Sequence, residues 1–98
     1  MKVVLSMPYK KHILVCVNER EEGKDCCSRV GGQDVFVELK SWVRDEGLTQ
    51  QVWVTRTRCL GFCNAVGTTV VVYPERMWFL EVEKKDLERL KEKICEGL

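Results

Sequence analysis

The chain has 98 residues, of which 45% are hydrophobic and 32% are charged. This composition is typical of a folded globular protein, and the length allows one hydrophobic core, so residues 1–98 are expected to form a single domain. A net charge of +1 argues against nucleic acid as a partner. No apolar run approaches the roughly 20 residues that cross a bilayer. The basic opening MKVVLSMPYKK is not a secretory signal, so we expect a cytoplasmic protein without membrane insertion.

Six cysteines are present in this short chain. Disulfides rarely persist in the cytoplasm, where clustered cysteines more often bind metal or carry out redox chemistry. Any single cysteine is also explained as a small buried hydrophobic residue. Four of the six lie in Gly-rich or turn-like surroundings, which favours a chemical role for the group.

The first half of the chain predicts a strand followed by a helix. Residues 11–17, KHILVCV, are mostly β-branched or aliphatic and predict a strand. A charged loop and the segment CCSRVGG follow. From Gln33 to Glu46, apolar residues recur at steps of three and four, which predicts a helix with one buried face. Gly32 is expected to be its N-cap, and Gly47 its C-terminal stop.

The second half predicts three more strands and a closing helix. Residues 51–57 alternate between apolar and polar, and residues 68–74 and 77–82 form two further strand patterns joined by a tight turn. Residues 83–98 predict an amphipathic helix. Its apolar stripe contains Leu87, Leu90, Ile94 and Leu98. Cys95, at the edge of that stripe, is expected to be a partly buried helix residue.

The order of these elements predicts an α/β fold. A strand-helix-strand unit is almost always a right-handed crossover between parallel strands. With the hairpin and last helix, this gives a mixed four-stranded sheet with helices packed on it, as in the thioredoxin-like layout. Both parallel strands end at one sheet edge, where the helix begins. The topology therefore brings together the cysteines that end or follow these strands, namely Cys16, Cys26, Cys27, Cys59 and Cys63.

Three kinds of centre could use these thiols. Structural zinc is commonly bound by two close cysteine pairs; Cys59 and Cys63 form one, but Cys16 and Cys27 are eleven residues apart. A dithiol redox centre favours Cys-x-x-Cys, which is absent. A 2Fe–2S cluster with four thiolate ligands is the third option. Its Rieske form needs two histidines and is excluded, because His12 is the only histidine.

The sequence resembles the thioredoxin-like 2Fe–2S ferredoxins over about residues 11–94. HILVC at 12–16 matches the His-x-x-x-Cys that ends the family's first strand. Cys27 and Gly31 match a Cys-x-x-x-Gly before the first helix, and residues 59–63 match Cys-x-Gly-x-Cys. The strand VVVYP and an aromatic return strand follow in the family's order.

This resemblance implies a thioredoxin-like fold and a 2Fe–2S cluster bound by Cys16, Cys27, Cys59 and Cys63. The spacing to the glycine favours Cys27 over its neighbour Cys26 as the second ligand. The family carries single electrons, so we expect an electron-transfer protein without catalytic residues. A reductase or an oxidoreductase would be its redox partner, and the resemblance makes a homodimer plausible.

The surroundings of the cysteines suit a negatively charged centre. The positive end of the first helix and backbone N–H groups around Gly31, Gly32 and Gly61 are expected to face it. The loop from Asn18 to Asp25 carries four acidic and two basic residues. It is expected either to help dock a redox partner or to be solvated without such a role.

Two other functions stay open. The cluster subunit of NADH dehydrogenases and hydrogenases has a similar domain, but its first two ligands are closer together and an extra N-terminal helical segment precedes them. Neither feature occurs in this sequence. A zinc-stabilised interaction module is the less favoured alternative.

Overall fold

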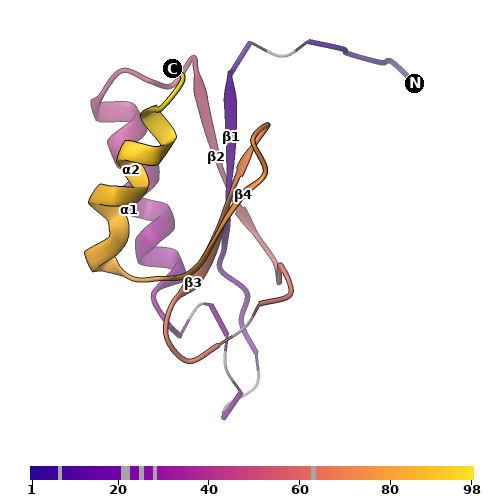
Figure 1. The fold of residues 1–98 in the computed structure, drawn as a ribbon. Coiled ribbons are helices and arrows are strands. Elements are labelled where there is room, and N and C mark those ends of the chain that lie inside the picture. Colours follow the sequence, from indigo (N-terminus) through magenta and orange to yellow (C-terminus); the bar gives the residue numbers. More distant parts are fainter. Residues whose placement is uncertain (7, 21–22, 25, 28, 63) are drawn as a thin grey trace.

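A computed structural model describes residues 1–6, 8–20, 23–24, 26–27, 29–62 and 64–98, and Figure 1 shows its fold. In chain order the elements are β1 (Lys11–Cys16), α1 (Gly32–Asp45), β2 (Val52–Thr57), β3 (Thr68–Tyr73), β4 (Met77–Val82), the short 3₁₀ helix η1 (Lys84–Asp86) and α2 (Leu87–Cys95). The predicted strands and helices are all present. Every strand boundary lies within one residue of its predicted position.

The four strands form one mixed sheet in the order β2-β1-β3-β4. β1 and β2 are parallel, with Cys16 opposite Thr57 at their ends. β3 is antiparallel to both β1 and β4. The parallel pair results from the crossover through α1, and the antiparallel pair from the tight turn between β3 and β4. The predicted α/β arrangement is therefore confirmed.

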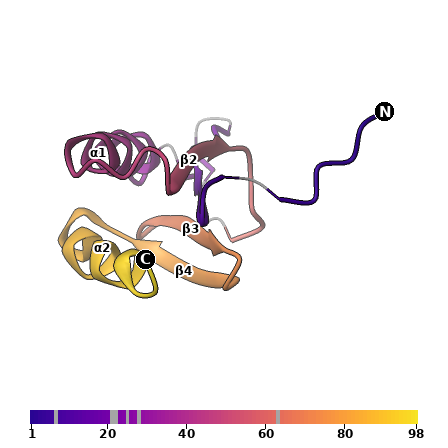
Figure 2. The same ribbon diagram turned by 90° about the horizontal axis from the view of Figure 1, so that it is seen from above.

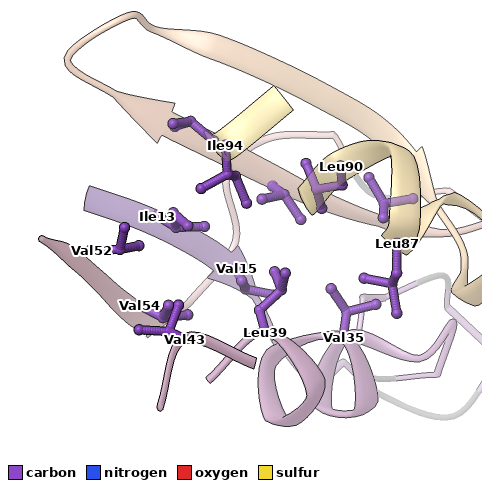
Figure 3. Packing of buried hydrophobic residues seen from close by; sticks show 13 residues of the cluster. Ile13, Val15, Val35, Leu39, Val43, Val52, Val54, Leu87, Leu90 and Ile94 are labelled. Carbon is purple, nitrogen blue, oxygen red and sulfur yellow. The ribbon is translucent and has the colours of Figure 1, made fainter. Parts of the chain in front are cut away.

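Both helices pack on the same face of the sheet, as Figures 1 and 2 show. Alternate residues of each strand point towards them. Ile13 and Val15 of β1 are buried there with Leu39 of α1 and Ile94 of α2 (Figure 3). The side chain of Cys16, next to Val15, therefore projects from the opposite face. Neither described helix is long and apolar enough to cross a membrane.

The apolar stripe of α2 faces the core as predicted. Leu87, Leu90 and Ile94 are buried. Cys95 is exposed, so the expectation that it is partly buried was wrong. One residue advances a helix by about 100°, which turns Cys95 away from the stripe that ends at Ile94.

α1 begins one residue earlier than predicted, and its N-cap is Gly31, not Gly32. Gly31 has a φ of 91°, a left-handed conformation that glycine adopts without strain. Gly32 is the first helical residue, and its N–H donates to the carbonyl of Cys27 at 2.7 Å. At the other end, the N–H of Gly47 donates to the carbonyl of Arg44, and the helix stops there as predicted.

A buried lysine joins three elements at the end of the sheet farthest from Cys16. Lys11 is 3% exposed, and its Nζ lies 3.0 Å from Oε2 of Glu75 in the β3–β4 turn. The same Nζ donates to the carbonyl of Glu96 at 2.5 Å. Glu96 is the C-cap of α2, where a cation interacts favourably with the helix dipole. Lys11 thus links β1, the hairpin and the last helix.

We predict that Glu75→Gln lowers the free energy of unfolding by roughly 1 kcal/mol at pH 7 but not in acid. Partial burial alone would raise the pKa of Glu75, yet the hydrogen bond and charge of Lys11 hold that pKa below its ordinary value of 4.5. Folding therefore favours the ionised carboxylate. Its contribution is complete above about pH 4.5 and is lost as the pH falls through the lower folded pKa. Urea unfolding at several pH values measures the effect.

Asp45→Asn is the matched control for this prediction. Asp45 pairs with Arg44, and both side chains are about two-thirds exposed or more. Removing an exposed pair of this kind changes stability by about 0.5 kcal/mol or less. A Glu75→Gln loss no greater than the control, or equal at neutral and acid pH, would contradict the prediction.

Candidate metal centre

Two of the predicted ligands, Cys16 and Cys27, are buried next to each other. Cys16 ends β1, and Cys27 lies in a turn before α1. The pKa of the Cys16 thiol is raised to about 11, chiefly by burial and also by the hydrogen bond and charge of Cys27, while backbone N–H groups of Asn18 and Leu60 oppose the rise. The two thiols are therefore within hydrogen-bonding reach, although they are far apart along the chain.

The loop after β2 reaches the same place. Leu60 follows Cys59, and its N–H is hydrogen-bonded to the Cys16 sulfur. Cys59 is exposed, and its Sγ accepts N–H groups from Gly61 at 3.2 Å and from Nη2 of Arg20 at 3.4 Å. Gly61 has a φ of 94°, a conformation that favours glycine. The Gly61 N–H thus faces the sulfur of one predicted ligand, Cys59.

The structure describes three of the four predicted ligands, because Cys63 lies outside the described residues. Within the described ranges, no three His, Cys, Asp or Glu side chains are grouped so that they could hold a metal ion. The structure thus brings together the sulfurs of Cys16 and Cys27. It places the backbone of the next loop against them, whereas the sulfur of Cys59 belongs to no such described group.

The first turn of α1 packs tightly on the backbone of the two buried cysteines. A Cβ added at Gly32 would lie 2.4 Å from the carbonyl oxygen of Cys16 and 2.7 Å from that of Cys27. Glycine is required for so close an approach. The N–H of Gly32 donates to the Cys27 carbonyl, so the expectation that this N–H faces the sulfurs was wrong. Gly32 instead fixes the distance between the helix and both cysteines.

Two threonines at the start of β3 adjoin Cys16. Oγ1 of Thr68 donates to the Cys16 carbonyl at 2.7 Å. Thr69 is 1% exposed, and no described residue makes a hydrogen bond to its Oγ1. Val15 faces Val70 in the last pair of the β1–β3 register, so Thr69, which precedes Val70, lies beside this end of β1. A buried hydroxyl without a partner costs about 1–3 kcal/mol.

These groups fit a metal centre with thiolate ligands. Backbone N–H groups of Asn18, Leu60 and Gly61 are hydrogen-bonded to cysteine sulfurs, and such donors stabilise bound thiolates. Nε2 of His12 lies 2.7 Å from Oγ1 of Thr55 within the sheet, so this nitrogen already has a partner. The metal ligands that the site offers are therefore sulfur atoms.

Known proteins share this sequence over most of its length. No family model matches the chain. It is 32% identical over 90 residues to the 2Fe-2S ferredoxin of Aquifex aeolicus (strain VF5). The alignment covers 89% of this chain and 80% of that protein. It is 33% identical over 90 residues to the 2Fe-2S ferredoxin of Clostridium pasteurianum, in an alignment that covers 90% of this chain and 87% of that protein. The chain belongs to the 2Fe–2S ferredoxin family.

Solved structures of this ferredoxin family have the same fold. The crystal structure at 1.5 Å resolution of the wild-type thioredoxin-like [2Fe-2S] ferredoxin from Aquifex aeolicus aligns with a TM-score of 0.78 and 32% identity, over 91% of this chain and 88% of that one. A second structure of a thioredoxin-like [2Fe-2S] ferredoxin from this organism gives a TM-score of 0.79 and 30% identity, over 91% and 83%. The predicted thioredoxin-like fold and the family resemblance are both confirmed.

An aromatic contact holds the loop of this ferredoxin site against the hairpin. The ring of Phe62 lies edge-on to that of Trp78 in β4, with 5.6 Å between centroids. Phe62 follows Gly61 and precedes Cys63, so the contact restrains the loop that carries the second pair of predicted ligands. Both rings remain about half exposed.

Sequence analysis missed two polar residues of the site. Arg20 lies 39 residues from Cys59, inside a loop that was expected to be solvated, and no spacing signal pointed to it. Thr69 was treated only as part of a strand. Its position beside the end of β1 depends on the register between β1 and β3, which the sequence pattern does not determine.

We predict that Gly32→Ala lowers the free energy of unfolding of the metal-free protein by roughly 2–3 kcal/mol. The added methyl group has no room unless the carbonyls of Cys16 and Cys27 move. Moving them displaces both thiols, so the variant should also retain less iron after reconstitution. Chemical denaturation and iron analysis provide the two measurements.

Gly47→Ala is the control. Gly47 has a φ of 70°, and nothing lies within 4 Å of a Cβ added there. Alanine at Gly47 therefore costs only the strain of the left-handed conformation, about 1–2 kcal/mol, and should leave iron content unchanged. Equal iron content in the Gly32→Ala and Gly47→Ala variants would refute the role assigned to Gly32.

Proposed function

We propose that this chain is a one-electron carrier whose 2Fe–2S cluster is bound by Cys16, Cys27, Cys59 and Cys63 within a single domain of residues 1–98. The observation that carries the proposal is the pair of buried thiols, Cys16 and Cys27, which lie close enough for Cys27 to raise the pKa of Cys16. Membership of the 2Fe–2S ferredoxin family supplies the identity of the cofactor.

A 2Fe–2S cluster with four thiolate ligands takes up and returns one electron. The residues of this chain supply the ligands and hold N–H donors around them. With all four ligand positions taken by cysteines, no coordination position is left for a substrate. This supports a carrier without catalytic residues of its own.

The exposure of Cys59 supports its side of the site as the place where a redox partner approaches. Cys59 is exposed, whereas Cys16 and Cys27 are buried, so a cytoplasmic reductase or oxidoreductase would reach the cluster from the Cys59 loop. The neighbouring acidic loop was expected either to help dock such a partner or to be solvated without a partner role. Three of its acidic residues lie outside the described residues: Glu21, Glu22 and Asp25.

Contacts of the adjacent pair support Cys27 as the second ligand. The Cys27 thiol is hydrogen-bonded to Cys16, and its carbonyl is held by Gly32 at the start of α1. Cys26 is equally buried, and its carbonyl accepts the N–H of Arg29 at 3.2 Å, but the pKa of Cys16 responds to Cys27. We therefore assign Cys26 a packing role.

We predict that anaerobically purified wild-type protein contains two irons and two sulfides per chain and absorbs in the visible range. Cys27→Ser should lose most of the iron, because a ligand is removed, and Cys26→Ser should keep nearly all of it. Metal and sulfide analysis, the absorption spectrum, and the electron paramagnetic resonance signal after reduction measure these outcomes.

Three results would count against this assignment. Loss of iron in Cys26→Ser but not in Cys27→Ser would reverse the ligand assignment. A colourless protein with one zinc and no sulfide would replace the carrier by a zinc-stabilised module. Co-purification with a large flavoprotein at a fixed ratio would favour a subunit of an NADH dehydrogenase or hydrogenase type of complex.

We also infer that two copies of the chain form a homodimer through β4. This strand is at the edge of the sheet, and unpaired edge strands invite pairing with another chain. Trp78 and Leu80 of β4 are exposed, and so are Phe62 and Val66 of the loop between β2 and β3. Together they form an apolar patch beside a free strand edge, which supports a second copy as the partner.

Light scattering tests the dimer. The wild-type protein should have twice the chain mass of 11.4 kDa, and Leu80→Lys should shift it towards the monomer because a charge enters the apolar patch. Val37→Lys is the control, since Val37 is an aliphatic residue on α1 that is 56% exposed, against 46% for Leu80. A monomeric wild type at micromolar concentration, or dissociation of both variants alike, would contradict the inference.

A further inference from the structure

A charged hydrogen bond connects the loop after β1 to a proposed ligand. Nη2 of Arg20 lies 3.4 Å from Sγ of Cys59 and donates to it. The same sulfur accepts the N–H of Gly61 at 3.2 Å. Arg20 is exposed, and an exposed arginine is ordinarily solvated without a fixed partner, so its position near the sulfur requires an explanation.

Arg29 provides that explanation. Its Nη2 donates to the carbonyl of Arg20 at 2.9 Å, and its Nη1 donates to the carbonyl of Lys24. The backbone N–H of Arg29 donates to the carbonyl of Cys26 at 3.2 Å. One side chain thus holds two carbonyls of the loop, while its own backbone belongs to the turn that contains Cys27. This arrangement fixes the backbone of Arg20 relative to the cysteine site.

A cation at this place acts differently on the two oxidation states. Reduction adds one negative charge to a site that already has thiolate ligands. A nearby positive charge stabilises the reduced state more than the oxidised one, and an N–H donor to a ligand sulfur acts in the same direction. The contact is solvent-exposed, so the effect is that of a screened charge rather than a buried one.

We propose that Arg20 raises the reduction potential of the centre through its guanidinium–sulfur contact with Cys59, and that Arg29 is the positioning residue that holds Arg20 there. This inference rests on the proposed 2Fe–2S function. A unit charge about 4 Å away in a water-like medium changes the ratio of reduced to oxidised protein about fivefold at a fixed ambient potential. For a one-electron couple this ratio corresponds to ~40 mV.

The chain offers a matched control in Arg58. It precedes Cys59 directly, carries the same charge and is exposed. Within the described part of the chain, the hydrogen bonds of the Cys59 sulfur include those from Arg20 and Gly61 but none from Arg58. Arg58→Gln therefore removes one positive charge from the same region without removing a donor to the sulfur.

The test is a spectroelectrochemical titration of the loaded protein, with iron content measured on each sample. Arg20→Gln should lower the midpoint potential by ~40 mV, equal to the fivefold change above, and Arg58→Gln should change it by less than a third as much. Arg20→Lys, which keeps the charge but loses the planar fork, should fall between wild type and Arg20→Gln. Concentrated salt screens the charge of Arg20, so it should bring the midpoint potential of the wild type closer to that of Arg20→Gln.

Arg29→Gln separates positioning from direct contact. This variant keeps Arg20 but frees its loop, so its potential should also fall, and it supplies the measurement if Arg20→Gln fails to load iron. Equal potentials in wild type, Arg20→Gln and Arg29→Gln, or equal shifts in Arg20→Gln and Arg58→Gln, would overturn the inference. A wild-type protein without a cluster would instead refute the proposed function, so the two failures are distinguishable.

Discussion

The close approach of α1 to the end of β1 is the constraint on which the rest of the site depends. At Gly32 there is no room for a side chain between the helix and the carbonyls of Cys16 and Cys27. The parallel crossover brings the two segments to one edge of the sheet, and the glycine lets them touch. The pairing of the two buried thiols depends on this close approach, which only glycine allows and which the hydrogen bond from the Gly32 N–H to the Cys27 carbonyl holds.

Around this rigid pair the chain arranges donors of two kinds. Backbone N–H groups face the sulfurs from Leu60 and Gly61, and these are fixed by the fold itself. The guanidinium of Arg20 is a full charge on a long side chain, and it needs Arg29 to hold its loop. In a site with both kinds of donor, the backbone can hold the ligands in place, while a few replaceable side chains set the charge around them.

Much of this organisation was predictable from sequence, for physical reasons. Hydrophobic periodicity gave the strands and helices, and the handedness of the crossover gave the shared edge for Cys16 and Cys27. Atomic crowding could not be predicted from the sequence: Gly31 rather than Gly32 is the N-cap, and the lack of space at Gly32 appears only in the folded chain. The Arg20 contact joins residues far apart in the chain through an irregular loop, and loops have no periodicity from which to predict such a contact.

The central claim is that four cysteines on three segments of the chain bind one pair of bridged irons. Anomalous diffraction from crystals of the anaerobically purified protein, recorded on both sides of the iron absorption edge, tests it most directly. The account predicts two adjacent iron peaks per chain within bonding distance of the sulfurs of Cys16, Cys27, Cys59 and Cys63. A single peak at the zinc edge, or iron bound away from the Cys16–Cys27 pair, would contradict it.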